Sequence, residues 1–467
     1  MRTLGLTKKT AFSLWQKTLL FYYYNRKCVI IKVAFAMMSR KNFLLSLTIL
    51  FFFRPIFSLD LTGLSDSLSG IFGDSYIDTN EGTTIFRSLN IPTGGRPESM
   101  GTAYTGLADD ISFFDYNPAG SAVLDRTEAA VFHNAWIADS AMETIAGTIR
   151  NGNLGLGAQL KCFYVPFTEY NLYGERVAGS YYSETSFTAN VAYNFLAGYD
   201  FKGIAVGANL RGSWRSIPDY TDNTTDEIIS GSGLAQSALA LMTDIGILFR
   251  LNGAKLYNDR EPNIRIGMSL NNIGVALTGF GSSVKIDDPL PTRIAVGVSY
   301  KPFSILLIST EFRQPVNLQS LSTSGKWSAA IGTEIKITTF FTFNTGFLLQ
   351  GANPRISLGS GFLIRGIQMN VNYTFDLTSS INPVNHISLS AKLRLSDRGR
   401  AEKQRHIDTL YTLGLARYSA GDFESAMEIW KEILQIDSRF DPAIEGIKAI
   451  ERSESLYQHI KNIQSLD

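Results

Sequence analysis

The residues of this 467-residue chain that could carry chemistry are few and scattered. Its histidines are isolated from one another, and no two stand at the spacing of metal ligands. They are His133, His386, His406 and His459. The two cysteines, Cys28 and Cys162, form neither a disulfide framework nor a metal pair. No nucleophile elbow and no phosphate-binding loop occurs. We therefore expect no enzyme activity, no metal and no cofactor.

One short segment, residues 96–120, concentrates glycine, acidic and turn-forming residues. Glycine adopts backbone conformations that other residues resist, and Asn-Pro is a turn-forming pair whose proline has a fixed φ. Such a compact segment could fold inside the mouth of a barrel. Its marked residues are Met100, Gly101, Asp109, Asp110, Asn117, Pro118, Ala119 and Gly120.

The elements that would have to hold this segment are β-strands. Residues 367–375 place a large apolar side chain at every odd position and a polar one at every even position. Because consecutive strand side chains point to opposite faces, one face is apolar and the other polar. About fourteen such runs occur, each bounded by Gly, Pro, Asn or Asp. They fall near residues 128–137, 142–150, 153–164, 184–196, 202–215, 236–250, 263–274, 291–300, 303–312, 326–337, 339–349, 354–365, 366–376 and 385–395.

The lengths and connections of these runs favour an antiparallel transmembrane barrel over residues 128–395. The lengths match the roughly 9–11 residues that a tilted strand needs to cross a bilayer. Most turns after even-numbered runs are tight, whereas those after odd-numbered runs are long and polar, as in 166–183 and 216–235. Outer-membrane barrels have short periplasmic turns and long outer loops, so we expect both termini in the periplasm. A soluble β-sandwich or propeller is the alternative, since it would also alternate.

The start of the chain resembles an export signal. Residues 38–42 are basic, and the apolar run 43–53 is too short to span a bilayer comfortably as a helix. We predict a secretory signal peptide over residues 38–58; an uncleaved anchor over 43–57 is the alternative. Residues 1–37 resemble neither a signal nor a domain, as expected if the start codon is placed too early.

After residue 395 the apolar period becomes helical, which predicts a separate domain over residues 396–467. Two amphipathic helices are expected over 398–418 and 423–436, and a third over 442–463 with Asp441 as its N-cap. The pattern resembles a tetratricopeptide repeat, in which two helices pack through small residues. The matching residues are Leu413, Gly414, Gly421, Phe423, Ala426 and Trp430, with Tyr418 one position late. The resemblance implies a docking module for a periplasmic protein; a hairpin that covers its own apolar face is the alternative.

The marked residues of 96–120 follow one another in the order found in the FadL-type long-chain fatty acid transporter superfamily. Met100-Gly101, Asp109-Asp110 and Asn117-Pro118-Ala119-Gly120 resemble the signature of its PorV-related branch, although Thr102 stands where a glycine is usual. The chain resembles most the uncharacterised spirochaetal outer-membrane proteins of this superfamily, over residues 85–395. The resemblance implies a fourteen-stranded barrel with residues 59–127 as a hatch in its lumen. It supplies no ligand.

Two functions follow from the resemblance. The first is an outer-membrane channel for diffusion of a hydrophobic or amphipathic small molecule, such as a long-chain fatty acid, with the Asn117-Pro118 turn as the moving part of the hatch. The second is a PorV-like scaffold whose helical tail recruits periplasmic partners for secretion or envelope assembly. Outer-membrane lipid is a partner in both. A net charge of +1 without a basic block gives no argument for nucleic acid. Inward-facing charges such as Arg211, Arg265, Glu334 and Arg394 are candidates to line a path.

Overall fold

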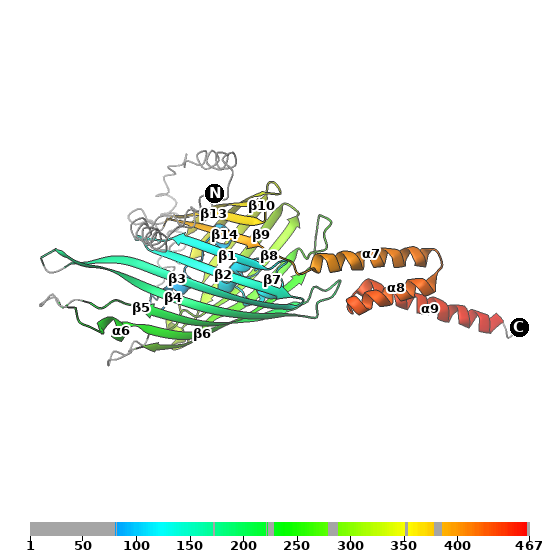
Figure 1. Cartoon of the computed structure of the whole chain (residues 1–467), viewed down its shortest axis with the longest axis horizontal. Helices are drawn as coiled ribbons and strands as arrows, with labels where there is room; N and C mark the ends of the chain where they lie inside the picture. Colours follow the sequence, from blue (N-terminus) through cyan, green and yellow to red (C-terminus); the bar gives the residue numbers. More distant parts are fainter. Residues whose placement is uncertain are drawn as a thin grey trace, which may run out of the picture. The chain divides into compact units, whose positions relative to one another are not determined.

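Fourteen antiparallel strands close into one barrel, in which β1 pairs with β14 (Figure 1). The computed structural model describes residues 80, 82–170, 173–220, 222, 228–278, 288–350, 354–377 and 385–464. The predicted signal peptide, residues 1–37 and the first part of the predicted hatch lie outside this set. The predicted fold class, an all-β barrel of about fourteen strands followed by helices, is confirmed.

Each strand of the barrel pairs with the strands that precede and follow it in the chain. The strands are β1 (Glu128–Ala135), β2 (Ala141–Asn151), β3 (Leu154–Tyr170), β4 (Arg176–Phe195), β5 (Ile204–Ser216), β6 (Ala238–Leu251), β7 (Ile264–Thr278), β8 (Arg293–Phe303), β9 (Leu306–Pro315), β10 (Ser328–Lys336), β11 (Phe341–Gln350), β12 (Arg355–Ile364), β13 (Ile367–Asp376) and β14 (His386–Arg394). Most boundaries lie within a few residues of the predicted ones.

The connection between β3 and β4 differs from the prediction. Residues 166–183 were expected as a loop, but the two strands continue to pair as far as Tyr170 and Arg176. Pro166 misleads sequence reasoning here, since it lacks the N–H that a central strand needs. Its strand is an edge at this point, because β2 pairs with β3 only as far as Tyr164. The proline therefore breaks no hydrogen bond to a neighbour on that side.

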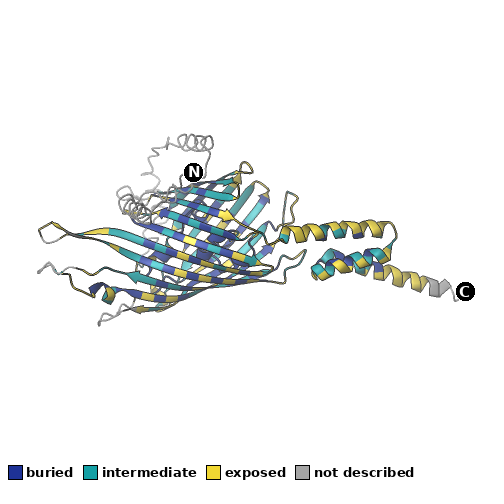
Figure 2. Ribbon diagram, viewed as in Figure 1, coloured by how far each residue is buried: buried dark blue, intermediate teal, exposed yellow. Residues whose placement is uncertain are grey.

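The two faces of the wall are inverted relative to a soluble protein. On β13, Asn370, Asn372 and Thr374 point inward and are at most 3% exposed. Outward-facing apolar side chains stay open, with Ile145 at 62% and Phe187 at 55% exposure. Figure 2 shows this alternation along the strands. An apolar outer surface of this extent is what a lipid-facing barrel wall requires, so the barrel spans a membrane.

Three helices follow the barrel: α7 (Arg400–Ser419), α8 (Phe423–Ile436) and α9 (Asp441–Gln464). They match the predicted helices to within two residues, although Asp441 is the first helical residue of α9 and not its N-cap. Asp422 caps α8 by accepting from Ser425 N (3.2 Å), and hydrogen bonds from Ser425 lower the pKa of Asp422. Among the described residues, none of the helices has the length and apolar composition needed to span a bilayer.

Trp430 is the centre of the helical core. A Cβ added to Gly414 would lie 2.4 Å from Trp430 Nε1, and one on Gly446 would lie 2.5 Å from the same ring. Ala426 is fully buried beside it, and Tyr418 contacts the Trp430 ring at 5.7 Å between centroids. The other predicted packing residues lie at the edge of this helical core. Leu413 is 46% exposed and Phe423 is 39% exposed. Gly421 follows the end of α7 and adopts the left-handed conformation (φ 81°). The tetratricopeptide resemblance stays a prediction.

Candidate functional site: the luminal segment and the barrel wall

The chain that precedes the barrel fills its interior. Residues 82–127, which we call the luminal segment, contain four short helices and lie within the ring of strands (Figure 1). The helices are η2 (Arg87–Asn90), α5 (Arg96–Ser99), η3 (Ile111–Asp115) and η4 (Pro118–Ala122). The helices α5, η3 and η4 pack against strands β1 to β6 and β11 to β13. Every residue of 93–108 and 110–124 is buried. This segment is the described part of the predicted hatch.

The wall meets the luminal segment through glycine. Eight strands each carry an inward-facing glycine at which an added Cβ would come within 2.6 Å of an atom of the luminal segment. These glycines, which we call the glycine seat, are Gly155, Gly207, Gly246, Gly267, Gly297, Gly332, Gly346 and Gly359. Six of them face one another in register as three cross-strand pairs. The absence of side chains lets the backbone of the luminal segment lie directly against the wall.

The two predicted aspartates join the luminal segment to two strands. Asp109 pairs with Arg96 of α5 (Nη1 to Oδ1 2.5 Å), and the same guanidinium pairs with Glu334 of β10 (Nε to Oε2 2.6 Å). Asp110 pairs with Lys392 of β14 and caps η3. All five side chains are less than a quarter exposed. Two cations oppose three carboxylates, and each carboxylate lies against at least one cation, which a buried ionic cluster needs in order to be tolerated.

Further buried pairs fix the luminal segment at other strands. Asp115 Oδ2 lies 3.3 Å from Lys161 Nζ of β3 and accepts a hydrogen bond from Thr93 (2.8 Å). Glu98 of α5 pairs with His386 of β14. The luminal segment is thus bound on several sides of the barrel, by contacts that alternation alone does not reveal.

The predicted Asn117-Pro118 turn is an anchor in this structure. The Asn117 amide nitrogen donates to Thr105 O and to Ile247 O of β6, both at 3.0 Å, while its amide oxygen caps η4. Pro118 O accepts from Asn190 of β4 (3.0 Å). The remaining marked residues pack tightly: Met100 and Ala119 are fully buried, Gly101 has φ 63°, and a Cβ on Gly120 would lie 2.5 Å from Phe113. The role of this turn as a moving part stays a prediction.

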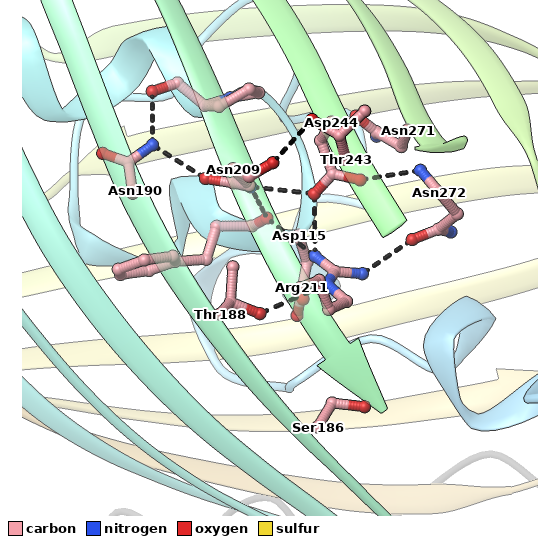
Figure 3. Close-up of polar contacts among 12 residues, drawn as sticks. Asp115, Ser186, Thr188, Asn190, Asn209, Arg211, Thr243, Asp244, Asn271 and Asn272 are labelled. Atoms are coloured by element: carbon pink, nitrogen blue, oxygen red, sulfur yellow. Dashed lines mark hydrogen bonds and ion pairs between the residues drawn. The ribbon is translucent and has the colours of Figure 1, made fainter. Parts of the chain in front are cut away.

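A second buried network joins β5, β6 and β7 (Figure 3). Arg211 pairs with Asp244 (3.0 Å) and donates to Asn272 Oδ1 (2.7 Å). Asn209 donates both to Asp244 (2.8 Å) and to Phe114 O of the luminal segment (3.1 Å). Arg211 was predicted as a charge that lines a path. Its side chain is instead occupied by these structural contacts, and the residue is only 3% exposed to solvent.

The network surrounds a β-bulge, at which Asn271 and Asn272 of β7 lie opposite the single residue Asp244 of β6. Asn272 adopts the left-handed conformation there, with φ 61°. Beyond the bulge β7 stays paired with β6 to Thr278, but its register with β8 ends at Asn271. Within the described residues, the stretch 272–278 therefore has a ladder partner on one side only.

A cavity of about 280 Å³ lies beside this incomplete ladder. It is lined mostly by small and apolar residues of β7 and of the segments before β8 and β10, namely Gly274, Val275, Ala276, Asp288, Pro289, Leu290, Thr292, Leu318 and Gln319. Leu290 and Ala276 also pack in an apolar cluster inside the barrel mouth, with Ile85, Phe86, Leu89, Ala238, Ala240 and Met242. We call this arrangement the β7–β8 opening.

Sequence reasoning identified the luminal residues but missed most of their wall partners. Lys392 and Lys161 belong to alternating strands, and nothing in the sequence says which luminal residue each one meets. Of the other predicted path-lining charges, Arg265 donates to Leu107 O (3.1 Å), whereas Arg394 is exposed and donates to Gln368. Within the ranges that the structure describes, no three His, Cys, Asp or Glu side chains gather as a metal site would require.

Several solved barrels share this general architecture at low similarity. The CymD monoaromatic hydrocarbon channel aligns over 65% of this chain and 97% of its own, with 13% identity and a TM-score of 0.45. The Pseudomonas putida toluene transporter TodX aligns over 65% of this chain and 98% of its own, with 11% identity and a TM-score of 0.44.

Sequence comparison gives closer relatives. A UPF0164 protein of Treponema pallidum (strain Nichols) is 27% identical over 401 residues, which cover 84% of this chain and 88% of the relative. A second UPF0164 protein of the same strain is 28% identical over 381 residues, covering 80% and 75%. The family model described as "Uncharacterised protein family (UPF0164)" matches residues 67–398, the luminal segment and the entire barrel included. The chain belongs to this family.

Proposed function

We propose that the protein is an outer-membrane channel that admits a hydrophobic or amphipathic small molecule by diffusion, with both termini in the periplasm. The observation that carries this proposal is the β7–β8 opening. A water-filled pore does not need an apolar gap in its wall, because ions and sugars pass along the lumen and do not cross the wall. A hydrophobic molecule dissolved in lipid, by contrast, needs a route through the wall that does not cross a polar face.

The opening offers such a route as far as the apolar cluster. Val275 is 63% exposed on the outer side, while Leu290 is 8% exposed and packs against Phe86 and Leu89 of the luminal segment. From that point on, the luminal segment and the glycine seat close the interior. Onward passage requires the luminal segment to rearrange, and this rearrangement is the role that the hatch would have. A long-chain fatty acid is one cargo that fits such a route.

The proposal is tested by filling the opening. Ala276→Phe places a ring in the cavity beside the apolar cluster, and Ala158→Phe places the same ring on the exposed outer face of β3 as a control. Both variants are expressed in cells whose outer membrane lacks other hydrophobic channels, and uptake of labelled toluene and labelled oleate is measured. We expect Ala276→Phe to reduce uptake several-fold and Ala158→Phe to leave it unchanged. Equal uptake by both variants and the wild type would refute the proposed route.

The scaffold function is favoured by one observation on α9. Leu456, Tyr457 and Ile460 are 62%, 67% and 49% exposed on neighbouring helical positions. A partner protein that docks on these helices would cover them. Deleting residues 398–467 separates the two functions: a channel keeps its uptake, whereas a scaffold loses a co-purifying periplasmic protein.

A further inference from the structure

Two titratable side chains stand on the outer face of the barrel wall. On β1 the buried residues Ala130, Phe132 and Asn134 point into the barrel, so His133 between them points outward. Glu143 is its cross-strand partner on β2, and His133 Nδ1 lies 2.7 Å from Glu143 Oε1. Of the acidic, basic and histidine residues in the fourteen described strands, these two alone occupy outward-facing positions. We call them the outer pair.

The outer pair lies within the apolar part of the wall. Ile145, the next outward residue of β2, is 62% exposed on one side of the pair, and Ile387 of β14 is 45% exposed on the other. Charged side chains on a lipid-facing wall destabilise a barrel, more so with greater depth in the bilayer. Among the described residues, His133 Nε2 and Glu143 Oε2 have no hydrogen-bond partner. One nitrogen and one oxygen of the pair therefore remain available on the outer face.

The outer pair belongs to a row of polar side chains that crosses four strands. Cys162 of β3 is opposite Glu143, and Thr185 of β4 is opposite Cys162. Both side chains face outward, and Thr185 Oγ1 donates to Cys162 Sγ (3.5 Å). The next outward residues on these strands, Leu160 and Phe187, are apolar and about half exposed. The polar surface is thus several strands wide.

A strip of small side chains crosses the same four strands. Ala129, Gly147, Ala158 and Ala189 face outward and are cross-strand partners of one another in that order. A Cβ added to Gly147 would meet nothing within 4 Å. Membrane helices associate through small residues and polar contacts, because lipid is as apolar as the side chains that it surrounds. The same physics applies to a barrel wall, and the wall of β1 to β4 offers both features.

We propose that this wall binds a second copy of the chain. Two copies that span one membrane in the same orientation are related by a two-fold axis along the membrane normal. Such an axis beside the outer pair places His133 of each copy against Glu143 of the other. With both ring nitrogens protonated, His133 donates from Nδ1 to its own Glu143 and from Nε2 to Glu143 of the second copy. The outer pair is therefore complementary to itself.

This inference does not rest on the proposed transport function. Strands β7 and β8 lie on the far side of the ring from β1 and β2. The β7–β8 opening consequently stays in contact with lipid in the dimer, so uptake and self-association can fail independently of each other.

The test measures self-association of the full chain in lipid vesicles. Protein that carries a donor or an acceptor dye at its C-terminus is reconstituted at decreasing protein-to-lipid ratios, and energy transfer between the dyes reports dimers. We expect transfer in the wild type at ratios where random encounters give none. Glu143→Gln and His133→Gln should each weaken the dimer by about tenfold or more, the loss expected for a charge-assisted hydrogen bond. Thr310→Gln, at an exposed outward position of β9, is the matched control and should associate as the wild type does.

An exchange of charge between the copies gives the sharpest result. His133→Glu places two carboxylates on the outer face and Glu143→Lys places two cations there, so neither variant should pair with itself. When the two variants are mixed, each carboxylate faces a cation, and energy transfer should return. Heat-modifiable mobility of every variant confirms that the barrel is folded.

Three results would overturn the proposal. The first is unchanged association of both glutamine variants, and the second is no recovery of energy transfer in the mixture of folded charge variants. The third is a folded wild type that is monomeric at every protein-to-lipid ratio, which would leave lipid head groups as the groups that face the outer pair.

Discussion

The glycine seat and the β7–β8 opening are two parts of one wall with opposite properties. At the glycine seat the ladders are continuous, most of the close contacts are backbone against backbone, and charged residues such as Arg96 and Lys392 are paired. At the opening the ladder is incomplete, and the lining is small and apolar. Two side-chain hydrogen bonds link β7 to the segment before β8 there: Asn272 donates to Pro291 O (3.0 Å), and Thr292 donates to Asn272 O (2.8 Å).

On the proposed function, the difference separates the part of the wall that would exclude water from the part that would admit a lipid-soluble molecule. The luminal segment is buried against the glycine seat, so on the proposed function it is the part that would block ions and water. On the proposed route, a hydrophobic molecule would pass mostly small and apolar side chains between the outer face of β7 and the apolar cluster, with Asp288 the one charged residue in the lining. The comparison therefore predicts that damage to the seat opens the barrel to ions, whereas damage to the opening changes the passage of hydrophobic molecules.

The largest effect is expected at Arg96. Arg96→Met leaves Asp109 and Glu334 buried without their cation, which should lower the free energy of unfolding by about 3–5 kcal/mol. Urea unfolding in lipid vesicles, followed by tryptophan fluorescence, measures this change, and ion conductance in planar bilayers should rise as the luminal segment loosens. Arg126→Met, at an exposed position, is the control. Wild-type stability and conductance in Arg96→Met would show that the ionic cluster does not hold the segment.

The next largest effect is expected at the glycine seat. A Cβ on Gly246 would lie 2.1 Å from Asn117 Oδ1, and one on Gly346 would lie 1.9 Å from Gly101 N. Each Gly→Ala change should cost about 1–3 kcal/mol by overpacking and should raise ion conductance, because the luminal segment is pushed away from the wall. Gly212→Ala on β5 adds the same methyl group where nothing lies within 4 Å. If Gly212→Ala and the two seat variants show the same ion conductance, the glycine seat does not hold the luminal segment against the wall.

A smaller effect is expected at Asn272. Asn272→Gly and Asn272→Ala both remove the side-chain bonds to Arg211 and Pro291, but alanine also carries the strain of the left-handed conformation, about 1–2 kcal/mol. Both variants should take up labelled toluene faster than the wild type, and Asn272→Ala should unfold at lower urea than Asn272→Gly. Slower uptake by Asn272→Gly would mean that the side chain supports the route and does not restrain it.

The strands were predictable from the sequence because lipid and lumen impose a period of two on every one of them. Ile145 and Phe187 must face lipid and Asn370 must not, whatever the neighbouring strands are. The bulge at Asp244 was not predictable, since it depends on which residues of β7 lie opposite it. The pairing of Arg96 with Glu334 joins positions that are 238 residues apart, and no local pattern records it. The glycines were the missed signal, because an inward glycine on strand after strand indicates that another backbone approaches there.

The smallest effect on the barrel is expected in the helical tail, at two adjacent residues that the sequence placed in the same role. Leu413 is 46% exposed, so Leu413→Ala should change tail stability by no more than about 0.5 kcal/mol. Gly414→Ala directs its methyl group at Trp430 and should unfold the tail at lower urea, seen as a shift in tryptophan emission. Neither change should alter ion conductance, because the luminal segment is held by wall residues of β3, β10 and β14. Conductance that rises with Gly414→Ala would instead make the tail part of the barrel's closure, and the contrast between seat and opening would then have to include the helices.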